Sequence, residues 1–126
     1  MLTWILLAIG VLLINIYLPA LLYFPSVGVA RHVGSRDVLP EPGTHVLRAR
    51  RALANMQENF PIFAVLAVLA LVVEGTDMDQ AILGAQLFVV GRAIYIPMYM
   101  ISVPWTRSAA FTIAFAGQIL MFLALL

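Results

Sequence analysis

Residues 2–24 form an almost uninterrupted apolar run that contains Asn15 and, near its end, Pro19. A helix rises about 1.5 Å per residue, so roughly 20 apolar residues cross the hydrocarbon core of a bilayer. Apolar residues make up 63% of the 126-residue chain, whereas soluble domains contain about 45–50%. Because a soluble fold of this size could not bury so many apolar side chains, the run predicts a membrane-spanning helix.

Further apolar segments predict three more spans in a single domain, residues 1–126. The expected helices cover residues 2–24, 45–74, 78–101 and 107–126. Residues 25–45 indicate a long loop, Gly75 a C-terminal cap for the second helix, and residues 102–106 a short turn. No positive charge precedes the first run, as a secretory signal would require, so we expect that helix to be retained. The sequence therefore predicts an all-α, integral membrane four-helix bundle.

The charged residues, 10% of the chain, are unevenly placed. All seven basic residues are arginines, and six of them lie in or beside the first and third loops, whereas the second loop carries acids. Because basic residues mark cytoplasmic loops, we expect loops one and three in the cytoplasm and both chain ends on the opposite side. The small net charge gives no support to a nucleic-acid partner. There is no cysteine, and His32 and His45 lack the spacing of metal ligands, so we expect no metal.

Two rows of polar side chains interrupt the second and third apolar helices, each spaced to share one helix face: Arg51, Asn55 and Glu58, and Arg92, Tyr95 and Tyr99. Both rows and Arg107 lie towards the expected cytoplasmic side. Ionisable groups inside a membrane are costly and usually face a bundle interior or a watery cavity. We therefore predict a polar chamber at the membrane boundary, suited to a small anionic or zwitterionic ligand.

Each of these residues also has a simpler explanation. Arginines at a membrane boundary can contact lipid phosphates, which applies to Arg48, Arg50 and Arg51, or signal topology, which applies to Arg107. Asn55 and Glu58 can hold helices together, with Glu58 paired to Arg92 or Arg51. Tyrosines at this depth can belong to the aromatic belt of the membrane interface.

Residues 51–61, RALANMQENFP, resemble the signature R-A-x-x-N-x-x-E-x-x-P of the MAPEG family, the membrane-associated proteins in eicosanoid and glutathione metabolism. The four spans, the long first loop, the row on the third helix and Arg107 after a short turn follow the family order, so the resemblance covers essentially the whole chain. It implies a homotrimer similar to bacterial-type microsomal glutathione transferases, with glutathione bound at subunit interfaces near the cytoplasmic face.

The resemblance also implies roles for individual residues. Those that would bind glutathione, as a co-substrate, are Arg31, Arg51, Asn55, Glu58, Arg92, Tyr95 and Tyr99. Arg51 and Glu58 would hold the two ends of the tripeptide, and Arg31 would reach it from a neighbouring helix. Arg107 would lie beside the glutathione sulfur, where Ser108 would donate a hydrogen bond, so both would be catalytic.

The implied chemistry depends on the position of Arg107 beside the glutathione sulfur. A free thiol has a pKa of about 8.5, and the thiolate is the nucleophile. A neighbouring guanidinium favours the anion and lowers the pKa of the thiol. The thiolate would then attack a lipophilic electrophile, or reduce a lipid hydroperoxide, that arrives from the membrane lipid. The resemblance therefore implies a detoxifying transferase or peroxidase, and we expect it in a bacterial inner membrane.

Departures from the family pattern leave other interpretations open. Leu53 and Asn59 stand where a relative has polar or aromatic ligand contacts, and Tyr95 stands where another branch has histidine. A non-catalytic subunit that keeps the trimer and the glutathione pocket is therefore the main alternative. A proton-coupled exporter ranks lower, because it needs a carboxylate deep in a span and Glu58 lies near the boundary.

Overall fold

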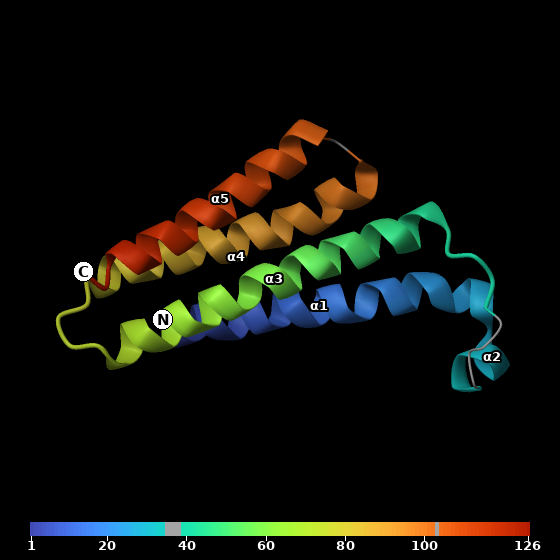
Figure 1. The fold of residues 1–126 in the computed structure, drawn as a ribbon, viewed down its shortest axis with the longest axis horizontal. Coiled ribbons are helices and arrows are strands. Elements are labelled where there is room, and N and C mark those ends of the chain that lie inside the picture. Colours follow the sequence, from blue (N-terminus) through green and yellow to red (C-terminus); the bar gives the residue numbers. More distant parts are fainter. Residues whose placement is uncertain (35–38, 103) are drawn as a thin grey trace.

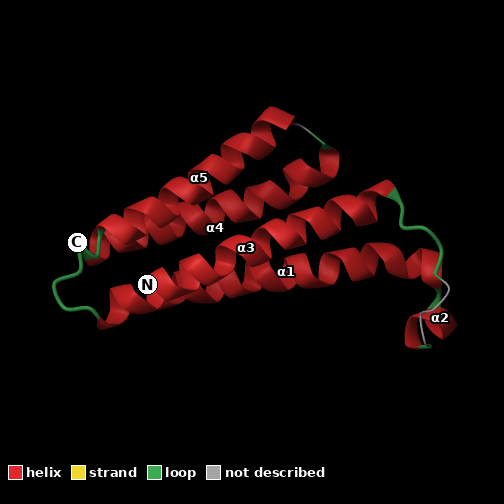
Figure 2. Cartoon of the chain, viewed as in Figure 1, coloured by secondary structure: helices red, strands yellow, loops and turns green. Residues whose placement is uncertain are grey.

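The computed structural model describes residues 1–34, 39–102 and 104–126. In these residues it contains four long helices and one short helix, and it contains no strand. The helices are α1 (Leu2–Val27), α2 (Val29–Val33), α3 (Thr44–Val72), α4 (Met78–Ile101) and α5 (Pro104–Leu123). All four long helices are long and apolar enough to cross a membrane. The predicted all-α, four-helix membrane bundle is thus confirmed (Figure 1, Figure 2).

The four long helices run side by side, with α1 along α3 and α4 along α5 (Figure 1). Both chain ends and the α3–α4 connection lie at one end of the bundle. The short helix α2 and the α4–α5 connection lie at the other end, which we call the loop-one end. Whichever way the bundle is inserted, the first and third loops therefore share one side of the membrane.

Several helix ends differ from the expected positions. α1 continues through Pro25 to Val27 instead of ending at residue 24. Gly28, with φ of 74°, then turns the chain into α2, which we did not expect. α5 begins at Pro104 rather than at residue 107, because proline suits the first helical turn, where backbone N–H groups have no helical partner anyway.

The connection between α3 and α4 is a compact turn. Val73, in an extended conformation, caps α3, which ends earlier than the expected residue 74. Gly75 lies in the following turn with φ of 84°, a conformation that glycine adopts without steric cost. The side chain of Asp77 then accepts a hydrogen bond of 3.0 Å from the backbone N–H of Gln80 and caps α4.

α4 and α5 pack closely through glycines that lie between the middle of α4 and the end that holds the chain termini. A Cβ atom placed on Gly84 would lie 2.5 Å from the carbonyl oxygen of Gly117. One placed on Gly91 would lie 2.8 Å from the carbonyl oxygen of Ala110. No side chain larger than hydrogen fits at these positions without a shift of backbone, so glycine permits the close contact of the two helices.

Towards the loop-one end, aromatic residues replace these glycines along the facing sides of α4 and α5. Tyr95 is buried, and Tyr99 and Phe111 are half-buried beside it. The two helices diverge in this direction (Figure 1). Bulky rings thus separate the helix pair where the smaller residues no longer hold it together.

A stacked aromatic pair and one amide hydrogen bond join α3 to its neighbours, and a second amide hydrogen bond lies within α3. Phe63 of α3 lies against Phe88 of α4 with ring centroids 4.3 Å apart, and both side chains are fully buried. Gln118 of α5 donates from Nε2 to the Asn59 carbonyl at 2.8 Å, and Asn59 donates from Nδ2 to the Asn55 carbonyl at 2.8 Å. These contacts fix the part of α3 that carries the polar row.

Candidate functional site

The polar row of α3 lies at the edge of the buried face of that helix. Asn55 is half-buried, whereas Arg51 and Glu58 are exposed on the surface of the single chain. Neighbouring positions on the inner side, such as Ala52 and Met56, are buried. The three side chains share one side of the helix, as their spacing predicts, and among the described residues only Asn55 of the three forms a hydrogen bond to another helix.

Arg92 connects the polar row of α3 to α4. Its side chain is only 2% exposed, and Nη1 donates a hydrogen bond of 2.5 Å to Oδ1 of Asn55. Because a guanidinium can only donate, the amide oxygen of Asn55 must face it and Nδ2 must point the other way. Arg92 therefore sets the orientation of the Asn55 amide and leaves a hydrogen-bond donor free to face a ligand.

The buried charge of Arg92 is surrounded by aromatic rings. Its guanidinium carbon lies 5.4 Å from the ring centroid of Phe88, 5.8 Å from that of Tyr95 and 5.4 Å from that of Phe111. The Nε and Nη2 atoms have no hydrogen-bond partner among the described residues. Ring faces attract cations, by about 2 kcal/mol or more per contact when water is excluded, and so offset part of the cost of burial.

Four of the predicted site residues meet in a pocket between α4 and α5. The pocket has a volume of about 310 Å³ and is lined by Tyr95, Tyr99, Arg107, Ser108, Phe111 and Thr112. The guanidinium carbon of Arg107 lies 5.0 Å from the ring centroid of Tyr99. The rings of Tyr95 and Tyr99 are 5.4 Å apart. The pocket therefore presents one cation against the face of Tyr99, with the Tyr95 ring beside it, at the point where the helix pair diverges.

Sequence reasoning missed two of the lining residues, Phe111 and Thr112. The helical spacing was the available signal, because Phe111 is four residues after Arg107 and Thr112 four after Ser108, so each shares a helix face with its partner. Thr112 also donates from Oγ1 to the Ser108 carbonyl at 3.0 Å. Phe111 matters more, since it contacts Arg92 as well.

Arg92 joins the pocket to the row on α3. Its aromatic neighbours Tyr95 and Phe111 also line the pocket, and its hydrogen bond reaches Asn55. Among the described residues, none of Arg51, Arg92 and Arg107 forms an ion pair. The region thus holds three guanidinium groups and the single carboxylate of Glu58, a net positive charge that suits an anionic ligand.

Three other positions named in the sequence analysis lie outside this pocket. Arg31 belongs to α2, but its side chain lies outside the described part of the structure, so its expected contact with the ligand stays a prediction. Leu53 lines a different pocket, between α1 and α3. Asn59 is buried, and its side-chain amide donates within α3, to the Asn55 carbonyl.

No curated protein matches the chain in a sequence search. The sequence model of the MAPEG family, by contrast, matches residues 1–126, the whole chain. This match agrees with the four apolar spans and with the polar rows described above, and it fits a glutathione-related transferase or peroxidase role. The protein is therefore an integral membrane protein that belongs to the MAPEG family.

Proposed function

We propose that the protein is a membrane-bound, glutathione-dependent transferase or peroxidase that activates the glutathione thiol for reaction with lipophilic electrophiles or hydroperoxides. The observation that carries this proposal is the pocket between α4 and α5, where Arg107 and Ser108 meet two tyrosines. Membership of the MAPEG family supports it.

The row on α3 matches the size and charges of glutathione. Arg51 and Glu58 stand seven residues apart on one side of the helix, which separates them by about 10 Å along its axis. An extended tripeptide spans about the same length. Arg51 pairs with a carboxylate of the ligand, Glu58 with its ammonium group, and Asn55 donates from Nδ2 to a peptide carbonyl between them.

The exposure of Arg51 and Glu58 supports a site completed by a second subunit. In the homotrimer that we propose, a neighbouring chain covers the ligand and its Arg31 reaches it from the first loop. The site then excludes water, which strengthens each charged contact.

The reaction centres on the thiol held beside Arg107. The guanidinium lowers the pKa of the glutathione thiol by favouring the anion, and Ser108 donates a hydrogen bond to the sulfur. In transfer, the thiolate attacks an electrophilic carbon, a C–S bond forms, and a leaving group departs with its bonding electrons. In reduction, the sulfur attacks the terminal oxygen of a hydroperoxide, the O–O bond breaks, and the departing oxygen takes a proton to give the alcohol. A second glutathione then converts the sulfenic product to a disulfide and water.

Glutathione binding to the purified protein, measured by calorimetry, tests the binding part of this proposal. We expect Arg51→Ala and Glu58→Ala each to weaken binding by about tenfold or more, because each removes a charge-assisted pair. Gln57→Ala is the matched control, since Gln57 is exposed on another side of the same helix. Affinity that is unchanged in both charge variants would contradict the site.

The ultraviolet absorbance of bound thiolate tests the catalytic part. At neutral pH we expect the glutathione complex of the native protein to show this absorbance and the Arg107→Ala complex to lack it. Arg48→Ala serves as the control, because the Arg48 guanidinium is bonded to the Met100 carbonyl at 2.8 Å and does not line the pocket. A thiolate signal that survives Arg107→Ala would assign activation to another group.

A non-catalytic subunit is the second candidate, and the place of Leu53 favours it. This side chain lines the pocket between α1 and α3 and, being a hydrocarbon, offers no polar contact to glutathione. Measuring whether the protein turns over any of a panel of electrophiles and hydroperoxides distinguishes the two candidate functions. Glutathione binding and a thiolate signal without any turnover would favour the non-catalytic subunit.

We also propose that the protein lies in a bacterial inner membrane with loops one and three in the cytoplasm. Six of the seven arginines belong to or flank these loops, and the second loop carries only acids. This orientation opens the candidate site to cytoplasmic glutathione.

A further inference from the structure

Asn15 places a buried amide in the middle of α1. Its side chain is 2% exposed, and Nδ2 donates a hydrogen bond of 2.9 Å to the Val11 carbonyl of the preceding turn. Because a carbonyl can only accept, Nδ2 must face Val11 and Oδ1 must point away from it. Oδ1 has no hydrogen-bond partner among the described residues. The glutathione chemistry proposed above makes no use of this residue.

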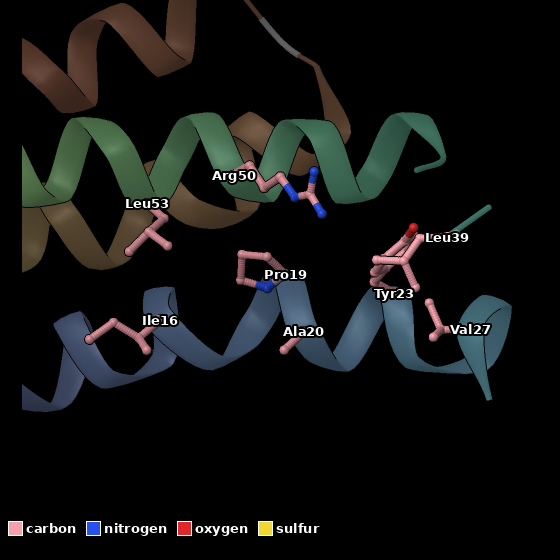
Figure 3. Close-up of a pocket in the computed structure, with 8 residues that line it drawn as sticks. All are labelled: Ile16, Pro19, Ala20, Tyr23, Val27, Leu39, Arg50 and Leu53. Atoms are coloured by element: carbon pink, nitrogen blue, oxygen red, sulfur yellow. The ribbon is translucent and has the colours of Figure 1, made fainter. Parts of the chain in front are cut away.

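The register between α1 and α3 can be followed along the two helices. They run in opposite directions (Figure 1). Ile16 of α1 and Leu53 of α3 lie at the same end of the pocket between them (Figure 3). Seven residues nearer the loop-one end on each helix, Tyr23 belongs to the same core cluster as Val46. Because the spacing is equal on both helices, they stay in register over this stretch.

This register brings Asn15 level with Arg92. Asn15 comes one residue beyond Ile16 on α1. Asn55 comes two residues beyond Leu53 on α3, so the two asparagines lie level to within about one helical turn. Arg92 donates from Nη1 to Oδ1 of Asn55, which puts its guanidinium at this level too. Since α1 packs against α4 as well as α3, two buried polar groups on neighbouring helices lie at the same depth.

The unpaired atoms of these two groups are complementary. Arg92 has two donor nitrogens, Nε and Nη2, without a partner among the described residues, and Asn15 has an acceptor in Oδ1. The Asn15 backbone carbonyl is a second acceptor, because Pro19 has no N–H to donate to it within the helix. Buried polar atoms almost always have a partner in the protein or in ordered water. A buried water has about two to four polar partners, which this set supplies.

We propose that water buried between α1 and α4 bridges Asn15 to Arg92. The water accepts from Nε or Nη2 of Arg92 and donates to Oδ1 of Asn15. The bridge holds the guanidinium so that Nη1 stays on Oδ1 of Asn55. Asn15 is therefore a positioning residue, which acts through Arg92 on the amide that faces glutathione. The bridge does not depend on glutathione binding, whereas the positioning role rests on the proposed function.

A double-mutant cycle tests the bridge without glutathione. The unfolding equilibrium of the purified protein in detergent is measured for Asn15→Leu, Arg92→Met and both together. We expect Asn15→Leu to raise the unfolding constant by about tenfold in the native protein and by less than about threefold in Arg92→Met, where the bridge is already lost. As the control, Asn15→Leu and Gln57→Leu should show no coupling, since Gln57 is exposed. Simple addition of the Asn15→Leu and Arg92→Met effects would overturn the bridge.

Asn15→Asp tests whether the guanidinium lies within reach of position 15. Beside Arg92 the new carboxylate meets a cation, so Asn15→Asp should unfold less readily than Asn15→Leu. In Arg92→Met the same carboxylate is buried without a cation, which is costly, so the order of the two variants should reverse. If Asn15→Asp is the less stable of the two in both backgrounds, Arg92 is out of reach and the proposal fails.

Solid-state NMR of the protein in lipid bilayers detects the water itself. With isotope-labelled arginine, the Arg92 side-chain resonance is identified as the one that Arg92→Met removes. We expect a cross-peak between its N–H protons and water in the native protein, and loss of this cross-peak in Asn15→Leu. Arg48→Ala, which removes a guanidinium bonded to the Met100 carbonyl, should leave it unchanged. Absence of the cross-peak from the native protein, or its persistence in Asn15→Leu, would exclude the bridge.

Glutathione affinity tests the positioning role separately. We expect Asn15→Leu to weaken binding by about threefold to tenfold and Asn15→Asp to restore it, because the carboxylate also holds the guanidinium in place. In Asn55→Ala, the change Asn15→Leu should cause no further loss, since its effect passes through Asn55. An equal loss in both backgrounds would overturn the positioning role. A native protein that binds no glutathione would instead contradict the proposed function, and the unfolding cycle would still decide the bridge.

Discussion

Arg92 of α4 donates from Nη1 to Oδ1 of Asn55 in α3 at 2.5 Å, and this hydrogen bond links the two polar rows that the sequence shows separately. Both residues are at positions where sequence reasoning expected ligand contacts. In the structure, however, the two residues have different roles. Arg92 is buried and orients the Asn55 amide, while Asn55 remains half-buried and can meet a ligand.

Replacing Asn55 by leucine should destabilise the protein by roughly 1–3 kcal/mol, because it removes the hydrogen-bond partner of a buried guanidinium. Asn55→Asp should be more stable than Asn55→Leu, since its carboxylate pairs with the cation. Thermal unfolding in detergent measures both, with Gln57→Leu, at an exposed position, as the control. Equal stability of Asn55→Leu and Gln57→Leu would show that the bond contributes nothing.

Adding a methyl group at Gly84 should weaken the contact of α4 with α5. The new Cβ would lie 2.5 Å from the Gly117 carbonyl oxygen and 2.9 Å from the Met121 nitrogen, so backbone must move. We expect Gly84→Ala to cost roughly 1–3 kcal/mol of unfolding free energy. Gly10→Ala, which meets nothing within 4 Å, should instead stabilise α1 by about 0.5–1 kcal/mol. If denaturation showed that both variants change the free energy of unfolding in the same direction, this packing would be contradicted.

Tyr99 should matter to catalysis through its ring rather than its hydroxyl. The ring lies under the Arg107 guanidinium at 5.0 Å, a contact that Tyr99→Phe keeps and Tyr99→Leu removes. We expect Tyr99→Leu to lower kcat/KM by about threefold to tenfold, as a lost cation–π contact would. Tyr99→Phe should stay within about twofold of the native value. A large loss in Tyr99→Phe would point instead to a role of the hydroxyl.

The pH dependence of the conjugation rate should report the glutathione thiol. A lowered thiol pKa leaves thiolate present at lower pH, so the native rate should rise with pH and level off below about 8.5, the value for a free thiol. Arg107→Ala should move this inflection to higher pH, and Arg107→Lys, which keeps the charge, should move it less. Identical profiles for native protein and Arg107→Ala would remove Arg107 from thiol activation.

Single cysteines can report membrane orientation without background, because the chain has no cysteine of its own. Glu41→Cys lies in the first loop and Glu74→Cys in the second, and both positions are exposed. In right-side-out vesicles, we expect an impermeant maleimide to label Glu74→Cys and to label Glu41→Cys only after lysis. The opposite pattern would reverse the proposed orientation.

Local patterns in the chain were enough to predict the class of fold and most of the candidate site. The lengths of the apolar runs predicted four spans, because bilayer thickness sets the length that a helix needs. Helical spacing placed Arg51, Asn55 and Glu58 on one side of a helix, because the spacing depends only on the helix itself. The motif around these residues also identified the family that the whole-chain match supports.

The spatial relationships between helices required the folded chain. The close contact at Gly84 and Gly117, the divergence of α4 from α5 and the resulting pocket with Phe111 depend on how side chains of distant segments fit together. The burial of Arg92 among three rings depends on the same fit. The periodicity of one helix indicates which of its faces is apolar. Which other helix packs against that face depends on the shapes of both surfaces, and these are set only in the folded chain.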